Sequence, residues 1–150
     1  MRIIVDADSC PVKQEIIEIA QKQGREVLLV SALSHYSEQE VPEFVQRIFV
    51  DDHDQEVDLR IMNIILSWDV LVTGDYGLAY LALGKKCRVL SPRGTEYTAE
   101  NIEGLMESRH FSAKIRKAGG RSKGPAPLLD KDRQQFRAEL TRLIKNNDFV

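Results

Sequence analysis

Short apolar runs alternate with amphipathic segments along most of the chain. Runs rich in Val, Ile and Leu predict five strands, at residues 2–5, 26–30, 46–50, 70–72 and 87–90. Apolar residues at helical spacing predict helices between them, at residues 11–22, 57–68 and 78–83, with 34–43 as a polar loop or short helix. Strands that alternate with helices favour a mostly parallel sheet covered on both faces. We therefore expect an α/β fold, a three-layer α/β/α sandwich built on roughly five strands.

The last third of the chain has a different pattern. Residues 99–117 are predicted to be helical, and residues 119–127 form a loop rich in Gly and Pro. Residues 132–145 then predict a helix whose apolar face holds Phe136, Leu140, Leu143 and Ile144. With 150 residues the chain is long enough for one well-buried core. We expect a single domain over residues 1–150, with a C-terminal helical extension from about residue 98.

Composition excludes several classes of protein. The chain is 43% hydrophobic and 29% charged, and no apolar run approaches the roughly 20 residues that a membrane helix needs. Cys10 and Cys87 are its two cysteines, and their spacing is not that of a C-x-x-C motif. We expect reduced thiols, a cytoplasmic location and no association with a membrane. The sequence leaves the oligomeric state open, a homodimer included.

Charge is distributed unevenly along the chain. The net charge is −2, yet residues 108–129 contain six basic residues and no acid, so the remaining residues carry −8. The basic residues are Arg109, Lys114, Arg116, Lys117, Arg121 and Lys123. A basic segment on an acidic body suits a polyanionic substrate such as RNA, and a solvated linker before the last helix is an equal alternative.

Acidic residues follow several of the predicted strands. Asp6 closes the first strand, Asp8 comes two residues later, and Asp75 follows the fourth. Asp58 lies early in the second helix. In sheets of this kind ligands bind beyond the carboxyl ends of the strands, where strand order reverses, so we expect these acids to converge at one edge. Asp6 and Asp8 face the same side if the chain stays extended between them.

A cluster of carboxylates at one edge calls for a divalent cation. Mg²⁺ or Mn²⁺ is held by carboxylate oxygens together with water and substrate phosphate, and it activates water for attack on phosphorus. Asp6, Asp8 and Asp75 are thus candidate catalytic residues, and these three with Asp58 are candidate metal ligands. The candidate phosphate contacts are Ser9, Thr73, Arg93, Arg121 and Lys123. A structural alternative is that Asp8 or Ser9 caps the first helix.

Four stretches of the chain carry a family resemblance. They are Val5-Asp6-Ala7-Asp8-Ser9-Cys10-Pro11-Val12, Val72-Thr73-Gly74-Asp75-Tyr76-Gly77-Leu78-Ala79, Val89-Leu90-Ser91-Pro92-Arg93-Gly94, and Gly124-Pro125 with Asp132-Arg133 and Phe136. They resemble the bacterial YaiI/YqxD family, and the match spans nearly the whole chain. That family looks like a compact branch of the PIN-like nucleases. The resemblance implies a Rossmann-like sandwich and a Mg²⁺- or Mn²⁺-dependent ribonuclease site for single-stranded RNA, formed by Asp6, Asp8 and Asp75 with Asp58 as a fourth acid.

Two other functions compete with the nuclease. Asp6-Ala7-Asp8 after an apolar run also resembles the first motif of haloacid-dehalogenase-like phosphatases, in which the first Asp is the nucleophile and the second a general acid or base. Against this, Ala79 stands where a second acid would follow Gly74-Asp75. The other alternative is a non-catalytic RNA- or metal-binding protein that uses the same edge, because a chain can keep a fold and lose the chemistry.

Overall fold

Six strands form one sheet in the order β3-β2-β1-β4-β5-β6. The computed structural model describes residues 1–120 and 126–147. The strands are β1 (Ile3–Asp6), β2 (Val27–Ala32), β3 (Val45–Val50), β4 (Val70–Val72), β5 (Arg88–Leu90) and β6 (Glu96–Tyr97). The first five run parallel, and β6 pairs with β5 in the antiparallel direction. Strand order reverses between β1 and β4, which places a topological switch point at their carboxyl ends.

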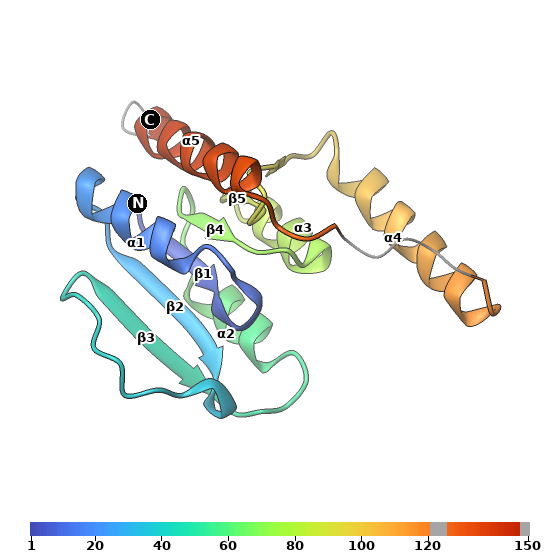
Figure 1. Cartoon of the computed structure of the whole chain (residues 1–150), viewed down its shortest axis with the longest axis horizontal. Coiled ribbons are helices and arrows are strands. Elements are labelled where there is room, and N and C mark those ends of the chain that lie inside the picture. The colour runs from blue at the N-terminus through green and yellow to red at the C-terminus, as the bar shows by residue number, and fades with distance from the viewer. Residues whose placement is uncertain (121–125, 148–150) are drawn as a thin grey trace.

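Helices cover both faces of this sheet (Figure 1). The α-helices are α1 (Lys13–Gln23), α2 (Glu56–Ile64), α3 (Tyr76–Gly84), α4 (Ile102–Lys117) and α5 (Asp130–Asn147), and two short 3₁₀ helices are η1 (Ala7–Ser9) and η2 (Leu33–His35). The helices α1 and α5 lie on one face, while α2 and α3 lie on the other (Figure 1). The expected three-layer α/β/α arrangement is therefore present.

The core consists of two apolar clusters separated by the sheet. Ile3 and Val5 of β1 point to the side of α1 and α5, whereas Ile4 between them points to the side of α2 and α3. All three are fully buried, as a central parallel strand requires. This explains why β1 is a continuous apolar run with no polar position before Asp6.

The C-terminal residues divide into a packed and a projecting part. In α5, the predicted apolar face (Phe136, Leu140, Leu143 and Ile144) is fully buried in the cluster that also contains α1. This helix is thus part of the sandwich. By contrast, α4 contacts α3 and extends away from the sheet (Figure 1).

Several boundaries differ from the sequence predictions. The sheet has six strands, because a hairpin turn through Ser91 and Gly94 brings Glu96–Tyr97 back onto β5. The helix predicted at 57–68 ends at Ile64, and Trp68 takes a left-handed conformation with φ 74°. The first helix begins at Lys13, because η1 occupies residues 7–9.

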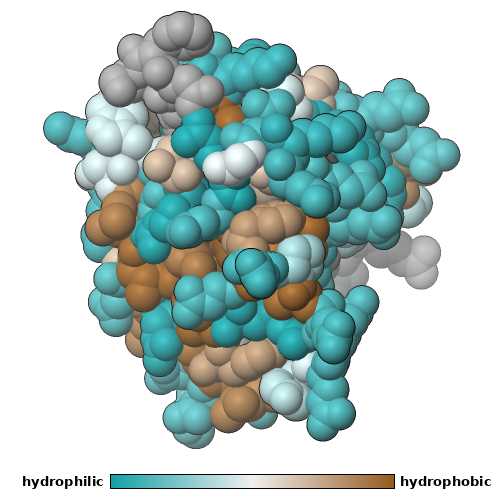
Figure 2. All heavy atoms as spheres, turned by 90° about the vertical axis from the view of Figure 1, so that its left-hand side faces the viewer, coloured by the Kyte–Doolittle hydropathy of each residue, from teal (hydrophilic) through white to brown (hydrophobic). Residues whose placement is uncertain are grey.

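The molecular surface on one side mixes apolar and hydrophilic side chains. On the face that looks left in Figure 1, towards the start of β2 and β3, hydrophobic side chains gather in the middle and hydrophilic ones surround them (Figure 2).

Within the described residues, no helix is both long enough and apolar enough to cross a membrane. The structure therefore agrees with the composition in showing no membrane-spanning segment over those residues.

Candidate active site

Two acids meet where β1 and β4 end side by side. Asp6 is the last residue of β1, and Val5 is paired in register with Val72, the last residue of β4. Thr73 follows β4 directly. Its hydroxyl donates a hydrogen bond of 2.9 Å to Asp6 Oδ2 and accepts one of 3.0 Å from the Asp75 backbone N–H. Thr73 therefore holds Asp6 and Asp75 on the same side of the switch point.

Asp75 has a second, structural role as the N-cap of α3. Its backbone is extended, and its Oδ1 accepts a hydrogen bond of 3.2 Å from the Leu78 N–H. Capping of this kind satisfies one of the free donors at a helix start and fixes the orientation of the carboxylate. A Cβ at Gly77 would lie 3.3 Å from Asp75 Oδ1, so the small residue leaves room for this cap. The cap occupies one carboxylate oxygen of Asp75.

Asp58 reaches this pair from the first turn of α2. Burial, the charges of Asp75 and Asp6, and a hydrogen bond with the Asp75 carboxyl together raise the pKa of Asp58 to about 6. Burial is the largest of these causes, and the charge of Asp75 is the next. Mutual repulsion of this kind is the usual sign of carboxylates that need a positive charge between them.

Asp6 is perturbed in the same direction. Burial raises the pKa of Asp6 most strongly, the hydrogen bond from Thr73 lowers it, and the charges of Asp75 and Asp8 raise it further. Within the described residues, neither Asp6, Asp58 nor Asp75 forms an ion pair with a basic side chain. Three negatively charged groups thus lie together without a compensating cation from the described protein.

This donor set suits a hard divalent cation. Over the described ranges, 1–120 and 126–147, no group of three or more His, Cys, Asp or Glu side chains is placed so that it could hold a metal ion. Mg²⁺ does not require one, because it is usually held by one or two carboxylates with water and phosphate in the remaining positions. Asp6, Asp58 and Asp75 supply oxygen donors of the right type, and their mutual repulsion would be relieved by binding.

A cleft of about 610 Å³ opens beside these acids. Asp6 and Asp75 line it, together with Ser9, Pro11, Arg93, Tyr76 and Arg109 among others. Arg109 comes from α4, and its guanidinium carbon lies 5.8 Å from the centre of the Tyr76 ring. A cleft lined by acids, arginines and a tyrosine is suited to a phosphate ester that carries an aromatic base.

The structure places Asp8 elsewhere. The expectation that Asp6 and Asp8 face the same side assumed an extended chain, but η1 turns the backbone at residues 7–9. Asp8 Oδ2 accepts a hydrogen bond of 3.0 Å from the Ala32 N–H, and Oδ1 lies 2.9 Å from His35 Nδ1. Asp8 lines a different cavity from Asp6 and Asp75. Its effect on the cleft is electrostatic, because the negative charge of Asp8 raises the pKa of Asp6.

The predicted phosphate contacts have different environments. Ser9 is exposed and lines the cleft. Arg93 also lines it, although its Nη1 is 3.2 Å from Asp132 Oδ2, and Thr73 is 2% exposed with its hydroxyl occupied by Asp6 and Asp75. Thr73 therefore orients the acids and has no hydroxyl proton left for a phosphate. Arg121 and Lys123 lie outside the described residues.

Sequence reasoning did not single out Arg109. Arg109 was visible only as one of six basic residues, and the packing of α4 against α3 brings it to the cleft.

Tyr97 is 4% exposed and stacks edge-on against Tyr76 at 5.7 Å between ring centres. Burial raises its pKa to about 12, so it serves as a packed neutral wall behind Tyr76.

The fold and the site define an α/β protein with an acidic cleft at the switch point of its sheet, and comparison with known proteins places the chain in a family. The sequence model described as "Uncharacterized BCR, YaiI/YqxD family" matches residues 4–146. A UPF0178 protein from Enterococcus faecalis is 44% identical over 147 residues, covering 98% of this chain and 99% of the relative. A UPF0178 protein from Bacillus anthracis is 49% identical over 144 residues, covering 96% and 99%. The chain belongs to the YaiI/YqxD family.

One solved structure is similar over nearly its whole length. The crystal structure of Rae1 (YacP) from Bacillus subtilis, a W164L mutant, aligns with a TM-score of 0.46 and 17% identity, covering 97% of this chain and 99% of that one. A likeness of this size supports no inference about the activity of the present chain, which is argued below from the site alone.

Proposed function

We propose that this protein is a PIN-like, Mg²⁺- or Mn²⁺-dependent nuclease that hydrolyses phosphodiester bonds in single-stranded RNA. The observation that carries the proposal is the pair Asp6 and Asp75, held by Thr73 at the switch point with Asp58 nearby and with no basic partner among the described residues. Carboxylates in such a cluster destabilise one another unless a cation or a proton lies between them. A bound cation, unlike a proton, would also explain why the adjacent cleft suits a phosphate group.

The three acids have separable tasks in this proposal. Asp6 and Asp75 would hold the cation, and Asp58 would complete the site through its contact with Asp75. When bound, such a cation lowers the pKa of water and neutralises charge that develops on the phosphate. Thr73 keeps Asp6 and Asp75 in register by its two hydrogen bonds. The cap to Leu78 prevents Asp75 from rotating away from the cleft.

Other residues that line the cleft would supply substrate contacts. Arg93 and Arg109 present guanidinium groups that suit phosphate oxygens, and Ser9 offers an exposed hydroxyl. Tyr76 provides an aromatic face on which an unpaired base can stack. Stacking needs a base that is free of a duplex, which favours a single-stranded substrate.

A phosphatase of the haloacid-dehalogenase type is less well supported. That chemistry needs Asp6 as nucleophile and Asp8 as an acid or base on the same substrate. Asp8 is instead directed to Ala32 and His35, and it lines a separate cavity. The position of Asp8 therefore favours the nuclease.

A single purified sample tests the proposal. We expect cleavage of a fluorescent single-stranded RNA in the presence of Mg²⁺ or Mn²⁺ and none in the presence of a chelator. Asp75→Asn should remove the activity, and Asp54→Asn, which changes an exposed aspartate just before α2, should retain it. Hydrolysis of an aryl phosphate with a beryllium fluoride adduct at Asp6, and no RNA cleavage, would overturn the nuclease in favour of the phosphatase. RNA binding without either reaction would support the non-catalytic alternative.

The basic segment is tested separately through the salt dependence of RNA binding. If Arg121 and Lys123 contact phosphates, replacing both with Ala should lower the slope of log affinity against log salt by roughly 1 to 2. The measurement is fluorescence anisotropy of labelled RNA at several salt concentrations. An unchanged slope would mean that these two residues do not contact the RNA.

A further inference from the structure

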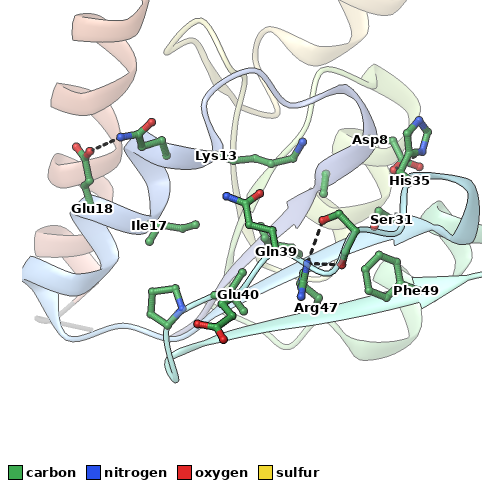
Figure 3. Close-up of a pocket in the computed structure, with 16 residues that line it drawn as sticks. Asp8, Lys13, Ile17, Glu18, Ser31, His35, Gln39, Glu40, Arg47 and Phe49 are labelled. Carbon is green, nitrogen blue, oxygen red and sulfur yellow. Dashed lines mark hydrogen bonds and ion pairs between the residues drawn. The ribbon is translucent and has the colours of Figure 1, made fainter.

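The crossover from β2 to β3 leaves part of the sheet without a helix above it. Parallel strands are usually joined by a helix that packs on the sheet, but here η2 is followed by an irregular segment, residues 36–44. A cavity of about 570 Å³ lies under this segment, on the side of α1 (Figure 3). Its volume is typical of a small-molecule site. It shares no lining residue with the acidic cleft.

The floor of this cavity carries polar groups where a sandwich normally has apolar ones. Leu29 and Ser31 of β2 lie beside Arg47 and Phe49 of β3, pair by pair. Ser31 is 7% exposed, and its hydroxyl makes no hydrogen bond to any described residue. Ser31 lines the cavity, and its hydroxyl is not among the buried polar atoms of the described residues that lack a partner, so a ligand or water in the cavity can reach it.

Arg47 has hydrogen-bonding capacity to spare. Its Nη1 donates to Ser37 O at 3.0 Å and to Ser37 Oγ at 3.3 Å, which anchors the irregular segment. Nη2 and Nε donate to no described residue. The guanidinium carbon is 5.9 Å from the centre of the Phe49 ring, and Tyr36 meets the same ring edge-on at 5.1 Å. Arg47 and Phe49 thus form a fixed cationic and aromatic shelf.

The charges around the cavity are unequally neutralised. Asp8 is engaged by Ala32 and His35, and Glu18 is engaged by Arg137 at 2.8 Å and Gln14 at 3.2 Å. Lys13, in contrast, forms neither a hydrogen bond nor an ion pair within the described part of the chain, and Figure 3 shows its side chain extending from α1 over the strands. The remaining acid, Glu40, lines the cavity from the exposed segment and likewise forms no ion pair within the described residues. Lys13 and Arg47 are the two basic side chains that an anionic ligand over the shelf would meet.

We propose that this cavity binds a small organic anion with a flat apolar body. The acid group, a carboxylate or a phosphate, is held by Lys13 and Arg47, and the ring lies on Phe49 against Leu29. Ser31 donates a hydrogen bond to the ligand at the floor. The site is independent of the proposed cation, because none of its residues belongs to the acidic cleft.

Four probes separate the parts of this recognition. Isothermal titration calorimetry in the presence of a chelator compares phenyl phosphate, phenylacetate, inorganic phosphate and benzyl alcohol. We expect phenyl phosphate or phenylacetate to bind with a millimolar or tighter Kd, and the better of the two identifies the acid group. Inorganic phosphate lacks the ring and benzyl alcohol lacks the charge, so both should bind at least about tenfold more weakly.

Variants and amide shifts then locate the binding. Lys13→Met and Arg47→Met should each weaken the better probe by about tenfold, whereas Lys22→Met, at the other end of α1, should leave its affinity unchanged. In ¹⁵N spectra the bound probe should shift the amides of Ser31 and Phe49, and those of Gly74 and Asp75 should stay in place. Absence of binding by either aromatic anion, equal binding by benzyl alcohol, full affinity of Lys13→Met, or shifts confined to Gly74 and Asp75 would each overturn the proposal.

Discussion

The two ends of β1 and β4 place carboxylates in opposite environments. At the amino-terminal end, Asp69 is 2% exposed and its oxygens accept hydrogen bonds from the Arg2 N–H, the Arg2 guanidinium and the Leu66 N–H, at 2.8 to 2.9 Å. At the carboxyl end, Asp6, Asp58 and Asp75 face one another with no basic partner in the described residues. One end supplies its own positive charge and the other does not.

This difference separates a structural acid from candidate functional ones. The buried Asp69 carboxylate has its charge balanced by an arginine and accepts hydrogen bonds from two backbone donors. These contacts fix the chain where β1 begins. Burial and neighbouring carboxylates raise the pKa of Asp6 and that of Asp58, and a positive charge between these acids would relieve the repulsion.

Removing the satisfied acid should cost the most stability. Asp69→Ala leaves the Arg2 guanidinium and the Leu66 N–H without their partner, so we expect the free energy of unfolding to fall by about 3–5 kcal/mol. Denaturant unfolding followed by circular dichroism measures it. Asp54→Ala, which alters an exposed aspartate, should change the stability by less than about 0.5 kcal/mol. If Asp69→Ala also lowered the free energy of unfolding by less than about 0.5 kcal/mol, the contact between Asp69 and Arg2 would contribute nothing to stability.

Neutralising an acid at the other end should have the opposite sign. Asp75→Asn keeps an oxygen for the cap to Leu78 and removes one of the repelling charges, so without a cation the protein should gain roughly 0.5–2 kcal/mol. Added Mg²⁺ should raise the thermal midpoint of the wild type and leave that of the variant nearly unchanged. Thermal melts with and without Mg²⁺ decide this. An unfolded Asp75→Asn variant would mean that Asp75 is a purely structural residue.

The raised pKa of Asp58 predicts a particular dependence of stability on pH. Its pKa is about 6 in the folded protein and near the ordinary value of 3.8 when unfolded, so folding favours the protonated form. The raised pKa of Asp58 therefore costs no folding stability below about pH 4. It lowers the free energy of unfolding increasingly as the pH rises to 6, and this loss persists above pH 6. Allowing for solvent screening, the change is about 1 kcal/mol.

Comparing the wild type with Asp58→Asn isolates this effect from other titrating groups. We compare the free energies of unfolding of the two proteins at pH 4.5 and at pH 7, without a divalent cation. At pH 7 the free energy of unfolding of Asp58→Asn should exceed that of the wild type. Cation binding should also weaken below pH 6, because protons compete for the same oxygens. If both proteins have the same pH profile, Asp58 is not coupled to Asp75 in solution.

The smallest effect is expected at Thr73. Its hydroxyl donates to Asp6 and lowers the pKa of that carboxyl, so Thr73→Val should raise the pKa of Asp6 further. A ¹³C-detected NMR titration of the carboxyl groups reports the change directly. Thr73→Ser retains the hydroxyl and should restore the wild-type value. An Asp6 pKa that does not respond to Thr73→Val would remove Thr73 from the site.

Much of the fold could be predicted because the parallel strands are buried on both faces. Continuous apolar runs such as Ile3–Val5 and Val70–Val72 are the direct consequence of that burial. The strand β6 was missed because two residues are too few to show alternation, and its pairing depends on the turn from Ser91 to Gly94. Gly94 has φ 85°, and a Cβ there would lie 2.7 Å from the Phe136 N, so this turn is set by contact with α5.

Tertiary contacts also explain the other differences. The apolar spacing predicts that the second helix continues to Trp68, but the Asp69 carboxylate takes the Leu66 N–H and the chain leaves the helix. The positions of Asp6 and Asp75 could be predicted, since both follow buried strands that meet at the switch point. The turn of η1, which directs Asp8 to the Ala32 N–H, depends on residues distant in the sequence, and no local pattern indicates it.

The most direct test of the account is a crystal of the protein soaked in Mn²⁺ and measured at the manganese absorption edge. We expect one anomalous peak at the carboxyl end of β1 and β4, with oxygens of Asp75 and of Asp6 or Asp58 as ligands at about 2.0–2.2 Å. The same soak of Asp75→Asn should show no peak there. An empty cleft in the wild type, or a peak only at another site, would contradict the claim that this cluster of acids exists to hold a cation.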